Sequence, residues 1–206
     1  MGVIKFGIAK IIVMKEQRMG FYDKRENVEG YIAMCEPYES SSLVDTVKKL
    51  LPIGSHLLEI GMGPGYDLTL LRKRFECLGT DYAQDFLDIY QAQYPEASLA
   101  LMDAVGLETK RTFDGIFSNK VLIHLTLDEL KVSLKRQEEI LAKGGYVFHS
   151  FWRGEGESDE GGILHKYYDD ETLKVIFSEF FDVLLVEGYR EFDDHDSVFV
   201  VAKKKG

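Results

Sequence analysis

Residues 57–65 read LLEIGMGPG, an apolar run that ends in a carboxylate and then passes through three glycines. This order of residue types predicts a buried strand followed by a tight turn into a helix. Glycine suits such a turn because it adopts backbone angles closed to other residues and lets a ligand approach the main chain without meeting a Cβ. The stretch therefore predicts a nucleotide-type binding site at the end of a strand.

The spacing of the glycines separates the known kinds of nucleotide site. A dinucleotide loop needs the pattern G-x-G-x-x-G, but after Gly61 and Gly63 the third glycine position is occupied by Tyr66. A phosphate-binding P-loop needs a Gly-Lys-Ser/Thr ending, which this chain does not have. The third glycine instead comes one residue early, at Gly65, and Glu59 lies two residues before the first.

Short apolar runs alternate with amphipathic segments through most of the remaining chain, which is typical of a parallel sheet with crossover helices. Thr126 and Glu129 predict a capping box that begins one helix, and Gly144-Gly145 predicts its end. A short polar link at residues 191–196, not a helix, joins the last two strands, so the last strand should be antiparallel. The expected strands cover residues 56–60, 75–80, 98–102, 113–118, 146–151, 183–187 and 197–202.

The segment before this alternation has helical rather than strand periodicity. Residues 19–51 predict helices that either cover the sheet edge or fold over the strand ends as a lid, and residues 1–14 predict a surface strand or short helix. A translation start at Met14 or Met19 is the alternative for that stretch. We expect one domain over residues 1–206, with an N-terminal helical cap at 1–52 and an α/β core at 53–206. The expected core is a Rossmann-like, seven-stranded, mostly parallel sheet with an antiparallel last strand and helices on both faces.

Composition restricts the partners. The 206 residues carry a net charge of -10, which disfavours nucleic acid because the protein would repel its phosphates. Lys5 and Lys10 interrupt the apolar N-terminal stretch, so no uncharged run is long enough to span a membrane. Cys35 and Cys77 match no metal or redox spacing, which fits a cytoplasmic location. The acidic turn around His195 should be solvated, and we predict no metal site.

The pattern E-x-G-x-G-x-G at residues 59–65 resembles the first motif of the class I methyltransferases that depend on S-adenosylmethionine (SAM). FDGIFSNKVLIHL at residues 113–125 and LAKGG at 141–145 look like the fourth and fifth motifs of that family. The resemblance covers roughly residues 20 to 203. It implies the fold of the family, SAM as methyl donor and S-adenosylhomocysteine (SAH) as product.

The resemblance also implies roles for residues at the strand ends. Asp81 corresponds to the acid that accepts hydrogen bonds from both ribose hydroxyls, for which an ionised carboxylate is suited. Asp103 and the adjacent backbone correspond to the segment that recognises the adenine amino group and ring edge. The expected cofactor-binding residues are Glu59, Gly61, Gly63, Gly65, Asp81, Tyr82, Asp103, Ala104 and Asn119.

His124 is the candidate catalytic residue, because it lies just beyond the fourth strand at a position where the family often has histidine. The preceding position, also often histidine in the family, is Ile123 here, and the alternative role for His124 is packing or helix capping. We expect the N-terminal helices and the link at residues 151–169 to line the acceptor pocket. The Gly/Glu-rich centre of this link predicts either a mobile loop that closes over ligands or a solvated acidic loop. The expected pocket residues are Tyr22, Tyr31, Trp152, His165 and Tyr168.

The function expected from this resemblance is methyl transfer from SAM to a small molecule by in-line displacement, for which proximity and orientation supply much of the rate. A base is required only if the acceptor carries a proton to be removed. Two alternatives stay open at this point: a protein methyltransferase of the same fold, and a non-catalytic SAM-binding module. The sequence identifies neither the acceptor atom nor the oligomeric state.

Overall fold

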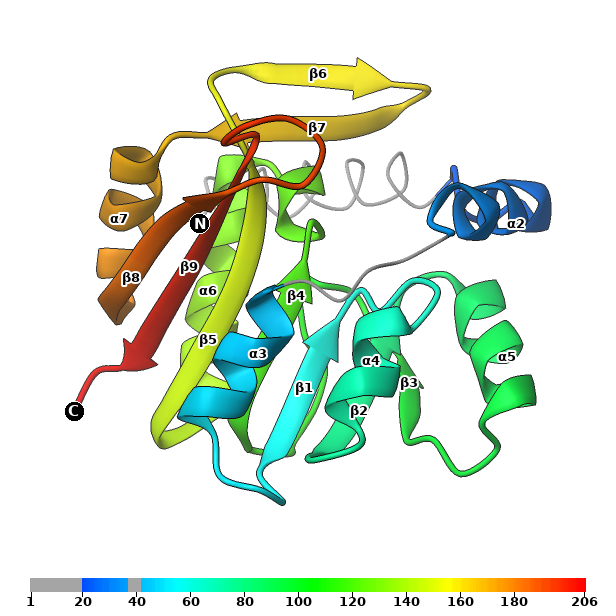
Figure 1. Cartoon of the computed structure of the whole chain (residues 1–206), viewed down its shortest axis with the longest axis horizontal. Helices are drawn as coiled ribbons and strands as arrows, with labels where there is room; N and C mark the ends of the chain where they lie inside the picture. The colour runs from blue at the N-terminus through cyan, green and yellow to red at the C-terminus, as the bar shows by residue number, and fades with distance from the viewer. Residues whose placement is uncertain (1–19, 37–41) are drawn as a thin grey trace, which may run out of the picture.

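The computed structural model describes residues 20–36 and 42–206. The strands in these residues form one sheet (Figure 1). They are β1 (His56–Ile60), β2 (Glu76–Asp81), β3 (Leu99–Leu101), β4 (Phe113–Asn119), β5 (Leu141–Arg153), β6 (Glu157–Glu160), β7 (Ile163–Tyr168), β8 (Phe181–Tyr189) and β9 (Ser197–Lys204).

The first five strands run parallel in the order β3-β2-β1-β4-β5. β9 pairs antiparallel with β5, and β8 pairs antiparallel with β9 at the edge of the sheet. The predicted sheet, mostly parallel with an antiparallel last strand, is confirmed. Its seven expected strands correspond to β1–β5, β8 and β9, with small shifts at their ends.

Helices cover both faces of this sheet, as predicted. They are α2 (Arg25–Met34), α3 (Ser42–Leu50), α4 (Tyr66–Leu71), α5 (Gln84–Gln93), the 3-10 turn η1 (Leu122–His124), α6 (Leu127–Ile140) and α7 (Asp170–Ser178). Neighbouring residues of β1 point to opposite faces: Leu57 packs in the cluster with α3, α4 and α5, whereas Leu58 packs with α6 and α7. The strand that precedes the glycine loop is therefore buried on both sides.

β6 and β7 form an antiparallel hairpin within the link that was expected to be a mobile or solvated loop. Gly161 and Gly162 make the turn, with φ of +65° and +92°, and the N–H of Gly162 donates to Asp159 at 2.8 Å. β7 then continues beside the end of β5. The expectations of seven strands and of a loop here are wrong, because the polar residues of β6 hide its strand character and its pairing partner is not apparent from local sequence.

The predicted start of α6 is confirmed, but its predicted end is wrong. The side chain of Thr126 accepts from the N–H of Glu129, whose carboxylate accepts from the N–H of Thr126. The helix ends at Ile140, before the expected Gly144-Gly145 stop, and β5 begins at the next residue. Gly144 has a φ of +78° inside β5, where the pairing with β4 is irregular. The glycine pair therefore serves a bulge rather than a helix end.

The two helices described in the N-terminal region lie in different places. α3 packs on the sheet, and α2 lies next to α5, where Val28 packs against Ala83 and Phe86. Figure 1 shows α2 and the β6–β7 hairpin at the edge of the sheet towards which β1 points. The expectation for residues 1–14 falls outside the described residues. None of the helices described for this chain combines the length and the apolar character needed to cross a membrane.

Candidate active site

The glycine loop joins β1 to α4 at the edge where the parallel strands end. Gly61, Gly63 and Gly65 have φ of +64°, +48° and +79°, which glycine adopts without strain. A Cβ on Gly65 would lie 2.3 Å from the ring of Tyr90. A Cβ on Gly63 would find its nearest neighbour, the ring of Tyr31, at 3.7 Å. The main chain at Gly63 is thus the part of the loop that is open to a ligand.

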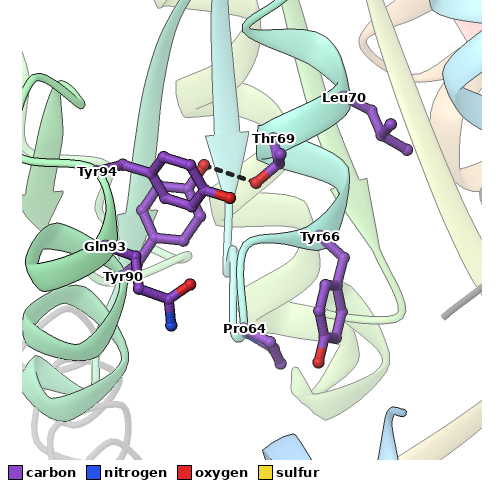
Figure 2. Close-up of a pocket in the computed structure, with 7 residues that line it drawn as sticks. All are labelled: Pro64, Tyr66, Thr69, Leu70, Tyr90, Gln93 and Tyr94. Carbon is purple, nitrogen blue, oxygen red and sulfur yellow. Dashed lines mark hydrogen bonds between the residues drawn. The ribbon is translucent and has the colours of Figure 1, made fainter. Parts of the chain in front are cut away.

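Side chains between α4 and α5 support the loop from behind (Figure 2). The hydroxyl of Thr69 donates to the carbonyl of Gly65 at 2.8 Å and lies 2.8 Å from the hydroxyl of Tyr90. The ring of Tyr90 fills the space beside Gly65. These contacts fix the glycine conformation. The hollow drawn in Figure 2 is lined by Pro64, Tyr66, Thr69, Leu70, Tyr90, Gln93 and Tyr94.

Asp81 ends β2 beside this loop. Its Oδ2 accepts from the N–H of Gly63 at 2.9 Å and its Oδ1 accepts from the N–H of Ala83 at 3.0 Å. Burial raises the pKa of Asp81 to about 6, although the backbone N–H donors act in the opposite direction. The N–H of Tyr82 is a third backbone donor to Asp81, and because a carboxylate has about four acceptor positions, capacity is left for a hydroxyl donor of a ligand.

Two further carboxylates lie at the same place. Glu59 is buried, and its Oε2 has no hydrogen-bond partner among residues 20–36 and 42–206. Burial raises the pKa of Glu59 well above its usual range, and the charges of Asp67 and Asp81 raise it further. Asp67, also buried, accepts from the side-chain amide of Asn119 at 3.0 Å. A buried carboxyl group beside the charges of two further acids forms an environment suited to a cationic ligand.

Asp103 and Ala104 follow β3. The carboxylate of Asp103 accepts from the N–H of Val105 at 2.6 Å, and the hydroxyl of Ser133 donates to the carbonyl of Ala104 at 2.6 Å. Both residues line a narrow cavity of about 50 Å³. The structure thus brings together the expected adenine segment, the expected catalytic histidine and one expected pocket tyrosine. The lining residues are Tyr22, Tyr82, Asp103, Ala104, Val121, His124, Leu125 and Ile163.

His124 occupies the end of η1, and its Nδ1 lies 2.8 Å from the carbonyl oxygen of Leu164 in β7. A carbonyl oxygen only accepts, so Nδ1 must carry the hydrogen and the neutral ring has its lone pair on Nε2. The ring of His165 packs edge-on against that of His124, with centroids 4.8 Å apart. The hairpin therefore sets both the tautomer and the orientation of His124.

Aromatic side chains form the wall of the cavity nearest α2. The ring of Tyr22 contacts those of Tyr31 and Tyr82, with centroid separations of 5.7 and 6.2 Å. Burial, together with the charge of Asp81, raises the pKa of Tyr22 to about 12, so its hydroxyl keeps its proton at neutral pH. Tyr31 faces Gly63, as noted above, and so connects this wall to the glycine loop.

Trp152 and Tyr168 are not among the residues that line this cavity, and neither are Tyr31 and His165, which contact lining residues. Trp152 stacks on Phe192 with ring centroids 6.0 Å apart, and the ammonium of Lys120 lies 3.8 Å from the centre of the Trp152 ring. Tyr168 packs edge-on against Phe151 and lines a separate groove with residues of α6 and α7. Their expected place in the acceptor pocket is therefore not supported by the geometry.

A comparison with protein families matches residues 57–145 to a methyltransferase domain. Over this segment the chain is similar to methyltransferases of class I. The matched segment runs from the glycine loop to the bulge of β5 and includes Asp81, Asp103 and His124. In this class the methyl donor is SAM and the product is SAH. No curated protein matches the chain at a significant level.

Solved methyltransferases share the fold at low sequence identity. The chain is similar to the 1,6-didemethyltoxoflavin-N1-methyltransferase of Burkholderia thailandensis, with a TM-score of 0.77, 13% identity and coverage of 97% of this chain and 90% of the other. For the amino pentose methyltransferase of Micromonospora echinaspora the TM-score is 0.69 at 19% identity, covering 85% and 96%. For the N-methyltransferase NodS of Bradyrhizobium japonicum the TM-score is 0.64 at 17% identity, covering 80% and 85%.

The residues of the methyltransferase domain fit SAM. The open main chain at Gly63 is a cradle that a Cβ would fill, and in the part of the chain that the structure describes the buried Oε2 of Glu59 lacks a partner. SAM carries a sulfonium and an ammonium group, which suit the three acids around the loop. Gly63, Glu59 and Asp81 would hold its amino acid part and ribose, and Asp103 with Ala104 would hold its adenine.

Sequence reasoning missed several residues of this site. Asp67 carries a signal that could have been used, because it is a carboxylate in the first turn of the helix that follows the glycine loop. Val121 contacts the loop closely: its methyl groups lie 2.6 Å from where a Cβ of Gly61 would be. Ile163 and Leu164 belong to the hairpin, and no local pattern places them beside His124.

Proposed function

We propose that this chain transfers the methyl group of SAM to a small-molecule acceptor bound between the glycine loop, η1 and the β6–β7 hairpin. The observation that carries the proposal is the open main chain of Gly63 beside the buried carboxylate of Asp81. When bound, SAM supplies an electrophilic methyl group on a positively charged sulfur. The work of the protein is then to orient the two reactants and to exclude water.

Each cofactor-binding residue has a distinct part in this proposal. Asp81 accepts hydrogen bonds from the ribose hydroxyls while its bond to Gly63 holds the loop. Glu59 and Asp67 stabilise the positive charge of the amino acid end, and Asn119 orients Asp67 through their 3.0 Å hydrogen bond. Tyr82 lines the cavity with Asp103 and would contact the adenosine there. Burial strengthens all of these interactions, because the local dielectric is low.

His124 is the proposed general base for an acceptor that loses a proton. Its Nε2 carries the lone pair because Nδ1 donates to the carbonyl of Leu164. An acceptor hydroxyl, amine or thiol that lines up with the methyl group would pass its proton to this nitrogen. His165 packs against the ring and holds its plane, so we place it as a positioning residue rather than a base.

The geometry of the cavity best supports a small acceptor. The cavity is narrow and is lined by Tyr22, which precedes α2, and by Ile163 of the hairpin, so a large rigid partner would have to displace both segments. The solved relatives named above include enzymes for didemethyltoxoflavin and an amino pentose, which supports a small acceptor here too. Organisation as one domain over residues 1–206, a cytoplasmic location and a partner other than nucleic acid remain predictions from the sequence.

Two measurements, made one after the other, test the proposal. Calorimetric titration with SAM and SAH tests the cofactor site, and absence of heat at saturating ligand would contradict it. Consumption of SAM is then followed while the protein is offered fractionated metabolite pools and, separately, a protein pool. Turnover with a metabolite fraction supports the proposal. Turnover with the protein pool alone would assign a protein substrate, and binding without any turnover would assign a SAM-binding module.

A further inference from the structure

A chain of hydrogen bonds crosses the apolar core and ends at the cofactor cavity. The hydroxyl of Ser118 in β4 lies 2.8 Å from Nδ1 of His149 in β5, and Nε2 of that ring lies 2.8 Å from the Oε1 of Gln137 in α6. The amide nitrogen of Gln137 donates to Ser133 at 3.1 Å, and Ser133 donates to the carbonyl of Ala104 at 2.6 Å. All four of these side chains have no exposed surface.

The chemistry of the groups determines which atom donates and which accepts in each of these hydrogen bonds. The carbonyl of Ala104 only accepts, so Ser133 must donate to it and must accept from the amide nitrogen of Gln137. The Oε1 of Gln137 then accepts from Nε2–H of His149, whose Nδ1 is left to accept from Ser118. Burial lowers the pKa of His149 to about 3, so its ring is neutral at physiological pH, as this arrangement requires. Every donor and acceptor that the chain needs is therefore defined.

Polar side chains at these positions require an explanation other than stability. Leu130, Leu134 and Val147 surround them in the same core cluster, and apolar residues of similar size would avoid the desolvation of a histidine, an amide and two hydroxyls. Buried networks of this kind rigidify what they connect when every member is satisfied. Here the two ends of the network are the carbonyl of Ala104 and the hydroxyl of Ser118.

Both ends adjoin the cofactor site. Ala104 lines the cavity next to Asp103, whose carboxylate already holds the N–H of Val105 from the other side. Ser118 immediately precedes Asn119, the residue that orients Asp67. In the loop after β3, the carbonyl of Ala104 is thus held by Ser133 from the core, and the N–H of Val105 is held by Asp103 within the loop. The hydrogen bonds through the core connect this loop to the end of β4.

We propose that Ser133, Gln137 and His149 are positioning residues that hold the Ala104 peptide so that the loop after β3 distinguishes the amino edge of adenine. This inference rests on the proposed function, since it requires that the cavity receives the adenine of SAM. The residues touch neither the cofactor nor the acceptor. Their effect is therefore on discrimination between bases, not on the transfer of the methyl group.

The test compares two ligands in the full chain: SAH and S-inosylhomocysteine, which has an oxygen in place of the adenine amino group. Wild type should prefer SAH. In Ser133→Ala the carbonyl of Ala104 loses its buried donor, and we expect the ratio of the two dissociation constants to fall by about tenfold. Gln137→Met, which keeps the side-chain length and removes both of its hydrogen bonds, should lower the ratio in the same direction. The second variant serves if Ser133→Ala does not fold.

Leu134→Ala is the matched control, because it is fully buried on the same helix but lies outside the hydrogen-bond chain. It should lower the melting temperature and leave the ratio unchanged. One outcome is that wild type binds SAH with a preference over the inosine ligand while Ser133→Ala and Gln137→Met both keep that preference. In that case the inference is wrong and the proposed function stands. An equal loss in Leu134→Ala would also overturn the inference. If wild type binds neither ligand, the proposed function itself fails.

Discussion

Oδ2 of Asp81 accepts a hydrogen bond from the backbone N–H of Gly63 at 2.9 Å, which ties the end of β2 to the glycine loop after β1. The two neighbouring strands therefore deliver one binding unit: a carboxylate with remaining acceptor capacity and, beside it, main chain without a side chain. The same bond helps to hold Gly63 at its φ of +48°. The following predictions depend on this unit or on the residues around it.

Alanine substitution should separate the glycines by their roles. Gly63→Ala should fold with a loss of stability of about 1 kcal/mol, the cost of a left-handed conformation for alanine, and should bind SAH weakly because its Cβ occupies the cradle. Gly65→Ala should be less stable still, by about 1–3 kcal/mol more, because its Cβ would overlap the ring of Tyr90. Denaturant unfolding and calorimetry measure the two effects. Normal SAH affinity in Gly63→Ala would contradict the assignment.

The raised pKa of Asp81 predicts opposite pH trends for stability and for binding. Its pKa is about 6 in the folded chain against an ordinary value of 3.8, so folding takes up a proton between these pH values. The contribution of Asp81 to the free energy of unfolding therefore falls as pH rises through this window, by about 3 kcal/mol in all, and is constant above it.

Binding should follow the ionised form. Because the ribose hydroxyls donate to a carboxylate, SAH affinity should fall as pH drops below about 6, by at most about tenfold per pH unit. Calorimetry at several pH values measures this, and Asp81→Asn should remove the dependence. An affinity that is flat from pH 5 to pH 8 in wild type would contradict the role of Asp81.

Substitution of His124 tests the proposed base. With a protic acceptor found in the metabolite screen, His124→Ala should lower kcat by about 10²–10⁴-fold, because the acceptor keeps its proton. SAH affinity should change little. His56→Ala is the control, since this histidine is exposed at the opposite end of β1 and should leave both quantities unchanged. A large loss of SAH affinity in His124→Ala, with kcat retained, would instead place this ring at the cofactor.

Lys120 is a structural residue in this account. Its backbone has a φ of +56°, and its ammonium donates to Ser197 at 2.7 Å and pairs with Glu191 at 2.9 Å. Burial lowers its pKa, while the charge of Glu191 opposes the shift. Lys120→Met should reduce the free energy of unfolding by about 1–3 kcal/mol, since the carboxylate of Glu191 loses its cationic partner and keeps the hydroxyl donors Tyr189 and Ser197. Adding Glu191→Gln should recover part of the loss in a double-mutant cycle, and strict additivity would contradict the coupling.

The parts of the site that the sequence predicted depend on local chemistry. Strand, glycine turn and helix follow one another between Leu57 and Leu71, so their geometry is encoded within a few residues. The ends of parallel strands meet at one edge, which is why Asp81 and Asp103 were expected beside the loop. The capping box at Thr126 is equally local, and its hydrogen bonds are present.

The expectations that differ from the structure concern residues whose position depends on strand pairing between segments far apart in the sequence. The β6–β7 hairpin is held by neighbours in space, and its glycines and acids read equally well as a loop. Trp152 and Tyr168 were expected in the pocket, but which side of a strand a residue takes depends on register, and register is fixed by the pairing of β5 with β7 and β9. The Leu164 carbonyl that fixes His124 could not be foreseen for the same reason.

One titration tests most directly whether the glycine loop and Asp81 bind an adenosyl amino acid. SAH is titrated calorimetrically into wild type, Asp81→Asn and the control Asp114→Asn. Asp114 also accepts a backbone N–H, that of His56 at 2.8 Å, but at the opposite end of the strands. We predict saturable binding to wild type and to Asp114→Asn, with affinity about 10–100-fold weaker in Asp81→Asn. No heat with wild type, or equal affinity in all three proteins, would contradict the account.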